Sequence, residues 1–187
     1  MFAVRKYDVC NFFCDLAKRS IALIGSKQID FELHIDENMP AHFYGYERCV
    51  KRVITNILAN AIKFTEAGVV IMTVSSIVSV RNLDDARLVV SVSDTGKGIT
   101  NDKASKLFSI SPGAGRKTIR VTEGTGLKIT SKLIYMMGGN ITVKSEPGKG
   151  SVFTVCIPQN RVDSKILGKE AVEKLQKFRS SYIKRNN

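Results

Sequence analysis

The sequence predicts an α/β two-layer sandwich, in which a mixed sheet of about five strands carries three longer helices on one face. Stretches with apolar residues at helical spacing alternate along the chain with short stretches of strand-like alternation. Of the 187 residues, 43% are hydrophobic, which is enough for one buried core. We expect one domain over residues 1–160 and a basic tail or linker of helical pattern over residues 161–187.

The first half of the chain is expected to supply two helices and three strands. Residues 7–24 have the pattern of an amphipathic helix, and residues 29–35 alternate apolar and polar side chains as a half-buried strand does. Residues 46–64 place apolar side chains three and four apart, which predicts the second helix. Residues 69–80 and 88–92 are rich in β-branched residues and predict a β-hairpin.

The second half adds one long helix and two more strands. Residues 102–108 suggest a short helix, and residues 109–125 show no periodicity, which is typical of a mobile loop. Residues 126–137 have apolar side chains at helical spacing. The strands expected at 140–145 and 151–157 are separated by a Pro-Gly-Lys-Gly turn, which closes a second hairpin.

The tail at 161–187 is charged on most faces, and three interpretations of it stay open. It carries eight basic and three acidic residues, while the whole chain has a net charge of +12. One helical stripe is apolar and consists of Ala171, Leu175, Phe178 and Tyr182. Such a helix can be a solvated linker, pack back on the domain, or pair with a partner helix.

Composition narrows the classes of function. A positive charge can attract nucleic acid, a membrane surface or an anionic ligand. No basic run is interleaved with aromatic residues as in single-strand binders, so nucleic-acid binding stays a minor alternative. No apolar run reaches the roughly 18 residues of a membrane span, and the four cysteines form no CxxC pair. We expect a cytoplasmic module, which reaches a membrane only through parts of a longer protein.

The first chemical motif lies on the helix at 46–64. Asn56, Asn60 and Lys63 are spaced four and three residues apart and share one face. An amide oxygen is a suitable ligand for Mg²⁺, and a nearby lysine can meet phosphate. Taken alone, the same spacing also fits three exposed polar side chains.

The second motif follows the strand at 88–92. Asp94 ends an apolar stretch, and its carboxylate can accept a hydrogen bond from an exocyclic amine. Gly96 and Gly98 lack a Cβ and are expected to let a flat ring approach the backbone beside Ile99. A turn in which Asp and Gly serve geometry alone explains the pattern equally well.

Two glycine-rich segments complete the set. Gly124, Thr125, Gly126 and Leu127 open the helix at 126–137, where unpaired N–H groups favour phosphate. A junction without a ligand fits these residues too. The turn at 148–150 belongs to a hairpin, and beyond it Thr154 is expected to face the ligand. Neither segment matches a P-loop or a dinucleotide-binding fingerprint.

In this order and spacing, the four segments resemble the N, G1, G2 and G3 boxes of the GHKL ATPase superfamily, which includes gyrase, MutL and histidine kinases. The sequence NILANAIKFT at 56–65 is most similar to the boxes of hybrid sensor kinases. The resemblance covers roughly residues 1–158. It implies a Bergerat-type sandwich that holds ATP and Mg²⁺ between the sheet, the helices and a lid at 109–123.

The resemblance also implies a role for each motif residue. Asn60 matches the Mg²⁺ ligand, Asn56 would assist the metal or the phosphates, and Lys63 would contact phosphate. The residues implied around the adenine are Asp94, Gly96, Gly98, Ile99 and Thr154, and those on the phosphate side are Gly124, Thr125, Gly126 and Leu127.

Four departures from the family pattern affect this expectation. Lys128 stands where a third glycine of the G2 box is expected, and Tyr46 replaces an aspartate that would cap the helix at 46–64. Leu107-Phe108 resembles the start of the F box, but its second phenylalanine is missing. Neither His34, on an expected strand, nor His42, in an expected loop, has the sequence context of a phosphoacceptor.

The sequence therefore predicts a histidine kinase catalytic module that transfers phosphate from ATP to a histidine on a separate dimerisation and phosphoacceptor domain. A response-regulator receiver domain is a further expected partner. Two alternatives remain open: a nucleotide-binding pseudokinase or interaction module, which Lys128 and the altered F box favour, and an anti-sigma-type serine kinase, which the Lys-Phe-Thr end of the N box disfavours.

Overall fold

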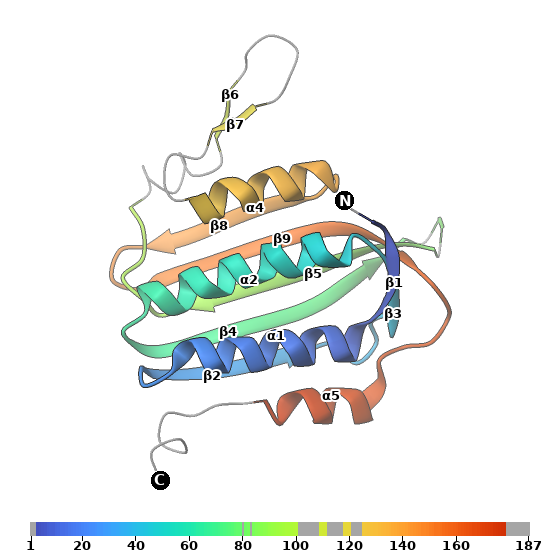
Figure 1. Cartoon of the computed structure of the whole chain (residues 1–187), viewed down its shortest axis with the longest axis horizontal. Helices are drawn as coiled ribbons and strands as arrows, with labels where there is room; N and C mark the ends of the chain where they lie inside the picture. Colours follow the sequence, from blue (N-terminus) through green and yellow to red (C-terminus); the bar gives the residue numbers. More distant parts are fainter. Residues whose placement is uncertain are drawn as a thin grey trace.

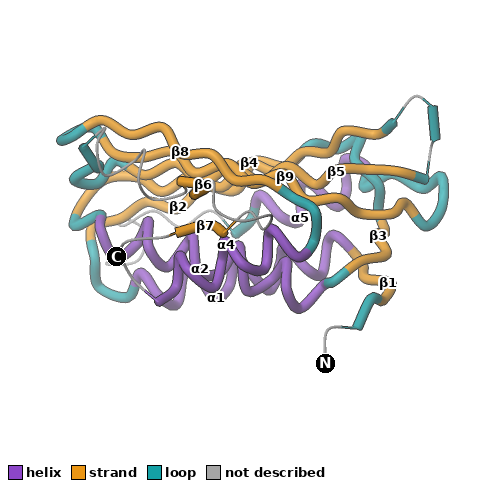
Figure 2. The backbone as a smooth tube through the Cα atoms, turned by 90° about the horizontal axis from the view of Figure 1, so that it is seen from above, coloured by secondary structure: helices purple, strands orange, loops and turns teal. Residues whose placement is uncertain are grey.

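The computed structural model describes residues 3–79, 81–82, 84–100, 109–111, 118–120 and 125–178. It has two layers, as expected: a seven-stranded sheet, with helices on one of its faces (Figure 1 and Figure 2). The three longer helices are α1 (Val9–Ile24), α2 (Glu47–Phe64) and α4 (Thr125–Met136). Helix α2 lies between the other two and packs against both of them. No helix in the described ranges is long and apolar enough to cross a membrane.

The sheet is mixed and larger than the sequence predicts. Its strand order is β1-β3-β9-β5-β4-β2, with β8 paired to β9. Among the described strands, only β2 and β4 pair in parallel. The five predicted strands correspond to β2 (Gln28–Ile35), β4 (Ala67–Val78), β5 (Asp85–Asp94), β8 (Asn140–Glu146) and β9 (Gly150–Arg161).

Four short strands do not appear in the sequence-based expectation. Two of them join the main sheet, β1 (Arg5–Asp8) and β3 (His42–Gly45), so His42 lies on a strand and not in a loop. The other two, β6 (Ser109–Ser111) and β7 (Thr118–Arg120), pair within the expected loop. Stretches of three or four residues are too short to show periodicity, and their pairing depends on distant partners. The expected helix at 102–108 lies outside the described residues.

The core lies between the helices and one face of the sheet. Strands β4 and β5 alternate, so that Val70, Met72 and Val74 face the helices together with Leu88 and Val90. Helix α2 covers them with a stripe of buried side chains at helical spacing, namely Cys49, Val50, Val53, Ile54, Ile57, Leu58, Ala61 and Ile62.

The ends of α2 are fixed differently. Tyr46 precedes the helix without a side-chain cap, as the missing aspartate implies. At the other end, the Thr65 hydroxyl donates to the Ala61 carbonyl at 2.8 Å. The Lys27 ammonium donates to the carbonyls of Ile62, Lys63 and Thr65 at 2.7, 3.2 and 3.1 Å. A cation at this position also interacts favourably with the negative end of the helix dipole. Both effects stabilise the last turn of α2.

The tail contains helix α5 (Gly168–Gln176), which packs against β2 and α1. Figure 1 shows it beside β2, which ends the sheet on that side. Val172 and Leu175 are buried, so this helix packs back on the domain. Of the predicted apolar stripe, Leu175 is buried and Tyr182 lies outside the described residues. The division of the chain at residue 160 stays a prediction.

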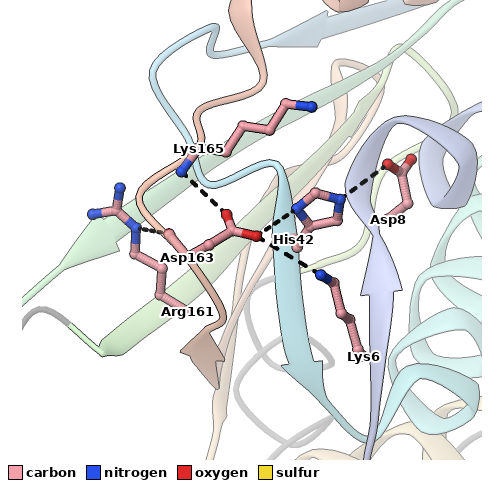
Figure 3. A network of polar contacts seen from close by, with 6 residues as sticks. All are labelled: Lys6, Asp8, His42, Arg161, Asp163 and Lys165. Carbon is pink, nitrogen blue, oxygen red and sulfur yellow. Dashed lines mark hydrogen bonds and ion pairs between the residues drawn. The ribbon is translucent and has the colours of Figure 1, made fainter.

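A polar network ties the segment before α5 to the beginning of the chain (Figure 3). Asp163 Oδ2 lies 3.1 Å from His42 Nδ1 and 3.8 Å from the Lys6 ammonium. The Lys165 N–H donates to Asp163 Oδ1 at 3.1 Å. The other ring nitrogen of His42 lies 3.6 Å from an oxygen of Asp8. The carboxylate thus joins β1, β3 and the segment between β9 and α5.

Candidate nucleotide-binding pocket

A pocket of about 560 Å³ opens between the end of α2, the end of β5 and the beginning of α4. Seven of the residues predicted from the motifs line it: Asn60, Lys63, Asp94, Gly98, Ile99, Gly126 and Leu127. They come from three segments that are far apart in the sequence. The fold therefore brings the three motifs to one cavity.

Asp94 is the buried carboxylate of this pocket. It ends β5 with 6% of its surface exposed, and its Oδ1 accepts the Gly96 N–H at 2.9 Å. Burial raises the pKa of Asp94, while hydrogen bonds from the Gly96 and Ser151 backbone N–H groups act in the opposite direction. A carboxylate has about four lone-pair positions. Two backbone donors therefore leave it able to accept a hydrogen bond from a ligand.

The glycines after Asp94 serve close packing of the backbone. A Cβ on Gly96 would crowd the Phe64 carbonyl and lie 2.9 Å from Asp94 Oδ1. Gly98 has a φ of +65°, and a Cβ there would collide with the Glu146 carbonyl. The sequence suggested that these glycines open the backbone to a flat ring. The structure shows that they also let the loop pack between α2 and the β8–β9 turn, while the approach of a flat ring stays a prediction.

The loop after Asp94 is held to both of its neighbours. The Lys97 N–H donates to the Phe64 carbonyl at 3.3 Å, and the Gly148 N–H donates to the Lys97 carbonyl at 2.9 Å. The Ile99 N–H donates to the Ser145 hydroxyl at 2.8 Å. These bonds fix the pocket wall on the side of the buried carboxylate.

Helix α2 presents two amides in different surroundings. Asn60 is half-buried and lines the pocket, and its side-chain amide forms no hydrogen bond with any described residue. Asn56, one turn earlier, donates to the Gly126 carbonyl at 3.3 Å and lies 3.2 Å from the Thr130 hydroxyl. The structure thus places Asn56 against α4, where its amide joins the two helices, and Asn56 itself does not line the pocket.

At the beginning of α4, Gly126 and Leu127 line the pocket. Gly124 lies outside the described residues, and for Thr125 only the helical backbone is described. Lys128 is exposed and does not line the pocket. A Cβ on Gly126 would meet nothing within 4 Å among described atoms, so the structure gives no steric reason for this glycine.

Thr154 was expected to face the ligand, and its position contradicts this expectation. Its hydroxyl lies 3.2 Å from that of Ser91, and it does not line the pocket. Side chains alternate along β9, so Ser151 and Phe153 point to the helix side and Thr154 to the other face. The burial of Val155 continues this alternation. The alternating apolar pattern of residues 151–157 therefore already indicated that Thr154 faces away from the helices.

Sequence reasoning missed six residues of the pocket wall, which are Ala61, Phe64, Lys97, Thr100, Ser151 and Phe153. Ala61 and Phe64 lie within the N-box segment. Ala61 follows Asn60, and Phe64 follows Lys63. Lys97 stands between the two glycines of the G1 segment, where its position was a usable signal. The F-box residues Leu107 and Phe108 lie outside the described residues.

Comparison with known proteins agrees with this geometry. Residues 45–161 match the family described as histidine kinase-, DNA gyrase B-, and HSP90-like ATPase. The sensor histidine kinase RcsC of Escherichia coli is 39% identical over 140 residues, which is 74% of this chain and 14% of RcsC. The histidine-protein kinase BarA of Escherichia coli is 32% identical over 165 residues, 86% of this chain and 18% of BarA. The chain thus matches under a fifth of the length of these relatives.

Solved structures show the same fold. Full-length ShkA in complex with AMPPNP aligns with a TM-score of 0.67 at 26% identity, over 87% of this chain and 32% of ShkA. The catalytic domain of histidine kinase ThkA aligns with a TM-score of 0.62 at 23% identity, over 83% of this chain and 97% of that domain.

Proposed function

Since this chain belongs to the family of histidine kinase-, DNA gyrase B- and HSP90-like ATPases, we propose that it binds Mg-ATP in the pocket between α2 and β5. We further propose that it transfers the γ-phosphoryl group to a histidine on a separate dimerisation and phosphoacceptor domain. The observation that carries the proposal is the buried carboxylate of Asp94 on the wall of this pocket.

Asp94 supplies base recognition. Its carboxylate retains acceptor capacity toward the cavity and can accept a hydrogen bond from the exocyclic amine of adenine. A base with a carbonyl in that position would leave the buried carboxylate facing another acceptor, which is costly. Ile99 and Phe153 give the same part of the wall an apolar surface suited to a flat ring.

Asn60 is the residue that fits a magnesium ion. Its amide lines the pocket, is half-buried and has no partner among described residues, so its oxygen is available as a hard ligand. Magnesium bound here would neutralise part of the triphosphate charge. Lys63, one turn further along α2, adds a positive charge for the phosphates.

The protein's own part in the transfer is to hold and orient the nucleotide. As the imidazole nitrogen of the acceptor forms a bond to phosphorus, the bond between the γ-phosphorus and the β–γ bridging oxygen breaks, and ADP leaves. Neither histidine described here fits the acceptor role. His34 bonds to Glu32 on β2, and His42 lies between Asp8 and Asp163.

Calorimetric titration with Mg-ATP tests the binding site. The variant Asp94→Asn replaces the acceptor with an amide and should weaken binding about tenfold or more, as expected for a lost hydrogen bond to a charged group. Asp15→Asn makes the same chemical change on an exposed part of α1 and should leave affinity unchanged. Equal affinities of wild type and Asp94→Asn would overturn the adenine assignment.

A transfer assay separates the kinase from the two other candidates. Incubation with γ-labelled ATP and an added phosphoacceptor domain should produce acid-labile label on the acceptor histidine. Binding without transfer would favour a nucleotide-binding pseudokinase, consistent with Lys128 in place of glycine. Acid-stable label on an added serine substrate would favour the serine kinase. Receiver domains remain proposed partners of a longer protein.

A further inference from the structure

Lys97 brings a second positive charge to the pocket wall. Its ammonium lies 4.8 Å from the centroid of the Phe64 ring, and the Lys63 ammonium lies 5.4 Å from the same centroid. Both lysines and the ring line the pocket. Two cations from different motifs, one on α2 and one on the loop after β5, therefore meet around one aromatic side chain.

The backbone of Lys97 is fixed from two sides. Its N–H bonds to the last residue of α2 and its carbonyl accepts the N–H of Gly148 in the β8–β9 turn. The adjacent Gly98 adopts a φ of +65° and packs against the Glu146 carbonyl. The loop therefore holds the root of the Lys97 side chain at the pocket, while its flexible stem lets the ammonium move over the wall.

The charge balance of the wall favours an anion. Among described residues, Lys63 and Lys97 have no carboxylate within ion-pair distance, and Asp94 is the acidic residue lining the pocket. Lys149, on the neighbouring turn, differs because its ammonium lies 2.6 Å from Glu146 and outside the pocket wall. A cavity with surplus positive charge attracts anionic ligands.

We propose that Lys97 is a second anion-binding residue, which together with Lys63 contacts the phosphates of the bound nucleotide. This inference rests on the proposed function, because it assigns a further residue to the same pocket. Since both ammonium groups surround one ring, a polyphosphate that reaches Lys63 also comes within range of the Lys97 side chain. A phosphate oxygen can replace the aromatic face as the partner, because charge-assisted contacts are the stronger ones.

Titrations of Lys97→Gln with Mg-ATP and with adenosine test this role. Loss of one charged contact should weaken Mg-ATP binding roughly three- to tenfold and change adenosine binding by less than about twofold. The loss should shrink at high ionic strength. Lys97→Arg should keep most of the affinity. The matched control Lys149→Gln removes one charge from the neighbouring turn and should bind both ligands as the wild type does.

Three results would contradict the inference: unchanged Mg-ATP affinity in Lys97→Gln, an equal loss in Lys149→Gln, or an equal loss for adenosine. Unchanged affinity in Lys97→Gln would mean that Lys97 makes no contact with the phosphates. An equal loss in Lys149→Gln would indicate a general charge effect, and an equal loss for adenosine would indicate a role in binding the base. A wild type that fails to bind Mg-ATP would overturn the proposed function itself. Normal wild-type binding with an unaffected Lys97→Gln would overturn only the role of Lys97.

Discussion

Asp94 has a pKa that burial raises above the usual 3.8, although two backbone N–H groups oppose the shift. In the unfolded chain the carboxyl ionises near its usual value, so the native state holds the proton to higher pH. Between these two pKa values the native state binds more protons, and stability falls as pH rises. Keeping this carboxylate ionised at neutral pH therefore lowers stability, as expected of a group retained for binding.

The variant Asp94→Asn removes this pH dependence. We expect its free energy of unfolding, relative to wild type, to rise as pH increases from below 3.8 to neutral. Urea denaturation at a series of pH values measures the difference. Asp15→Asn, at an exposed position, corrects for the shared change in net charge. A difference that is constant or falls with pH would contradict the assigned burial of Asp94.

Helix α2 illustrates how one helical face serves two purposes. Asn56 and Asn60 lie four residues apart, yet one bonds to α4 and the other lines the pocket. The sequence predicted the shared face but not this difference, because the position of α4 depends on the packing of the whole core. The same limit applies to Lys97, whose neighbours Phe64 and Gly148 come from two other segments.

The two amides should respond differently to alanine. Asn56→Ala removes the amide that donates to the Gly126 carbonyl and to the buried Thr130 hydroxyl, so it should cost about 1–2 kcal/mol of stability. Asn60→Ala should change stability by less than about 0.5 kcal/mol but abolish the gain in ATP affinity from magnesium. Denaturation and calorimetry with and without a chelator measure both effects. The reverse pattern would exchange the two roles.

Strand periodicity predicted much of the sheet and also explains an error. The long strands β2, β4, β5, β8 and β9 follow from alternation within each segment. The same alternation places Ser151 and Phe153 on the face that lines the pocket and Thr154 on the opposite face, so the expectation that Thr154 faces the ligand was wrong. Strands β1 and β3 have four residues each, so they are identified by the pairing of β1 with β3 and of β3 with β9.

At the scale of the whole molecule, the tail is the part that the sequence left undecided. Its helix has one apolar stripe, which suits a partner, a linker or the domain itself. Packing on the domain requires a surface on α1 and β2 that fits this stripe, together with the contacts of Asp163. The sequence of the tail alone shows neither of these. The bond from the Leu167 N–H to the Met39 carbonyl, at 2.8 Å, adds a further anchor before α5.

Packing of α5 can be measured with a pair of leucines. Leu175 is fully buried, so Leu175→Ala should lower the free energy of unfolding by about 2–4 kcal/mol. Leu23 on α1 is 53% exposed, so Leu23→Ala should cost less than about 0.5 kcal/mol. Urea denaturation compares them. A cost for Leu175→Ala no larger than that for Leu23→Ala would mean that α5 does not pack on the domain in solution.

Every role proposed for the pocket residues requires that a nucleotide occupies the pocket between α2 and the end of β5. Amide NMR spectra recorded during titration with magnesium and a non-hydrolysable ATP analogue test this directly. We expect the largest shifts at Asn60, Asp94, Gly98 and Ser151, with the signals of α5 unchanged. Shifts confined to another surface, or none at saturating ligand, would contradict it.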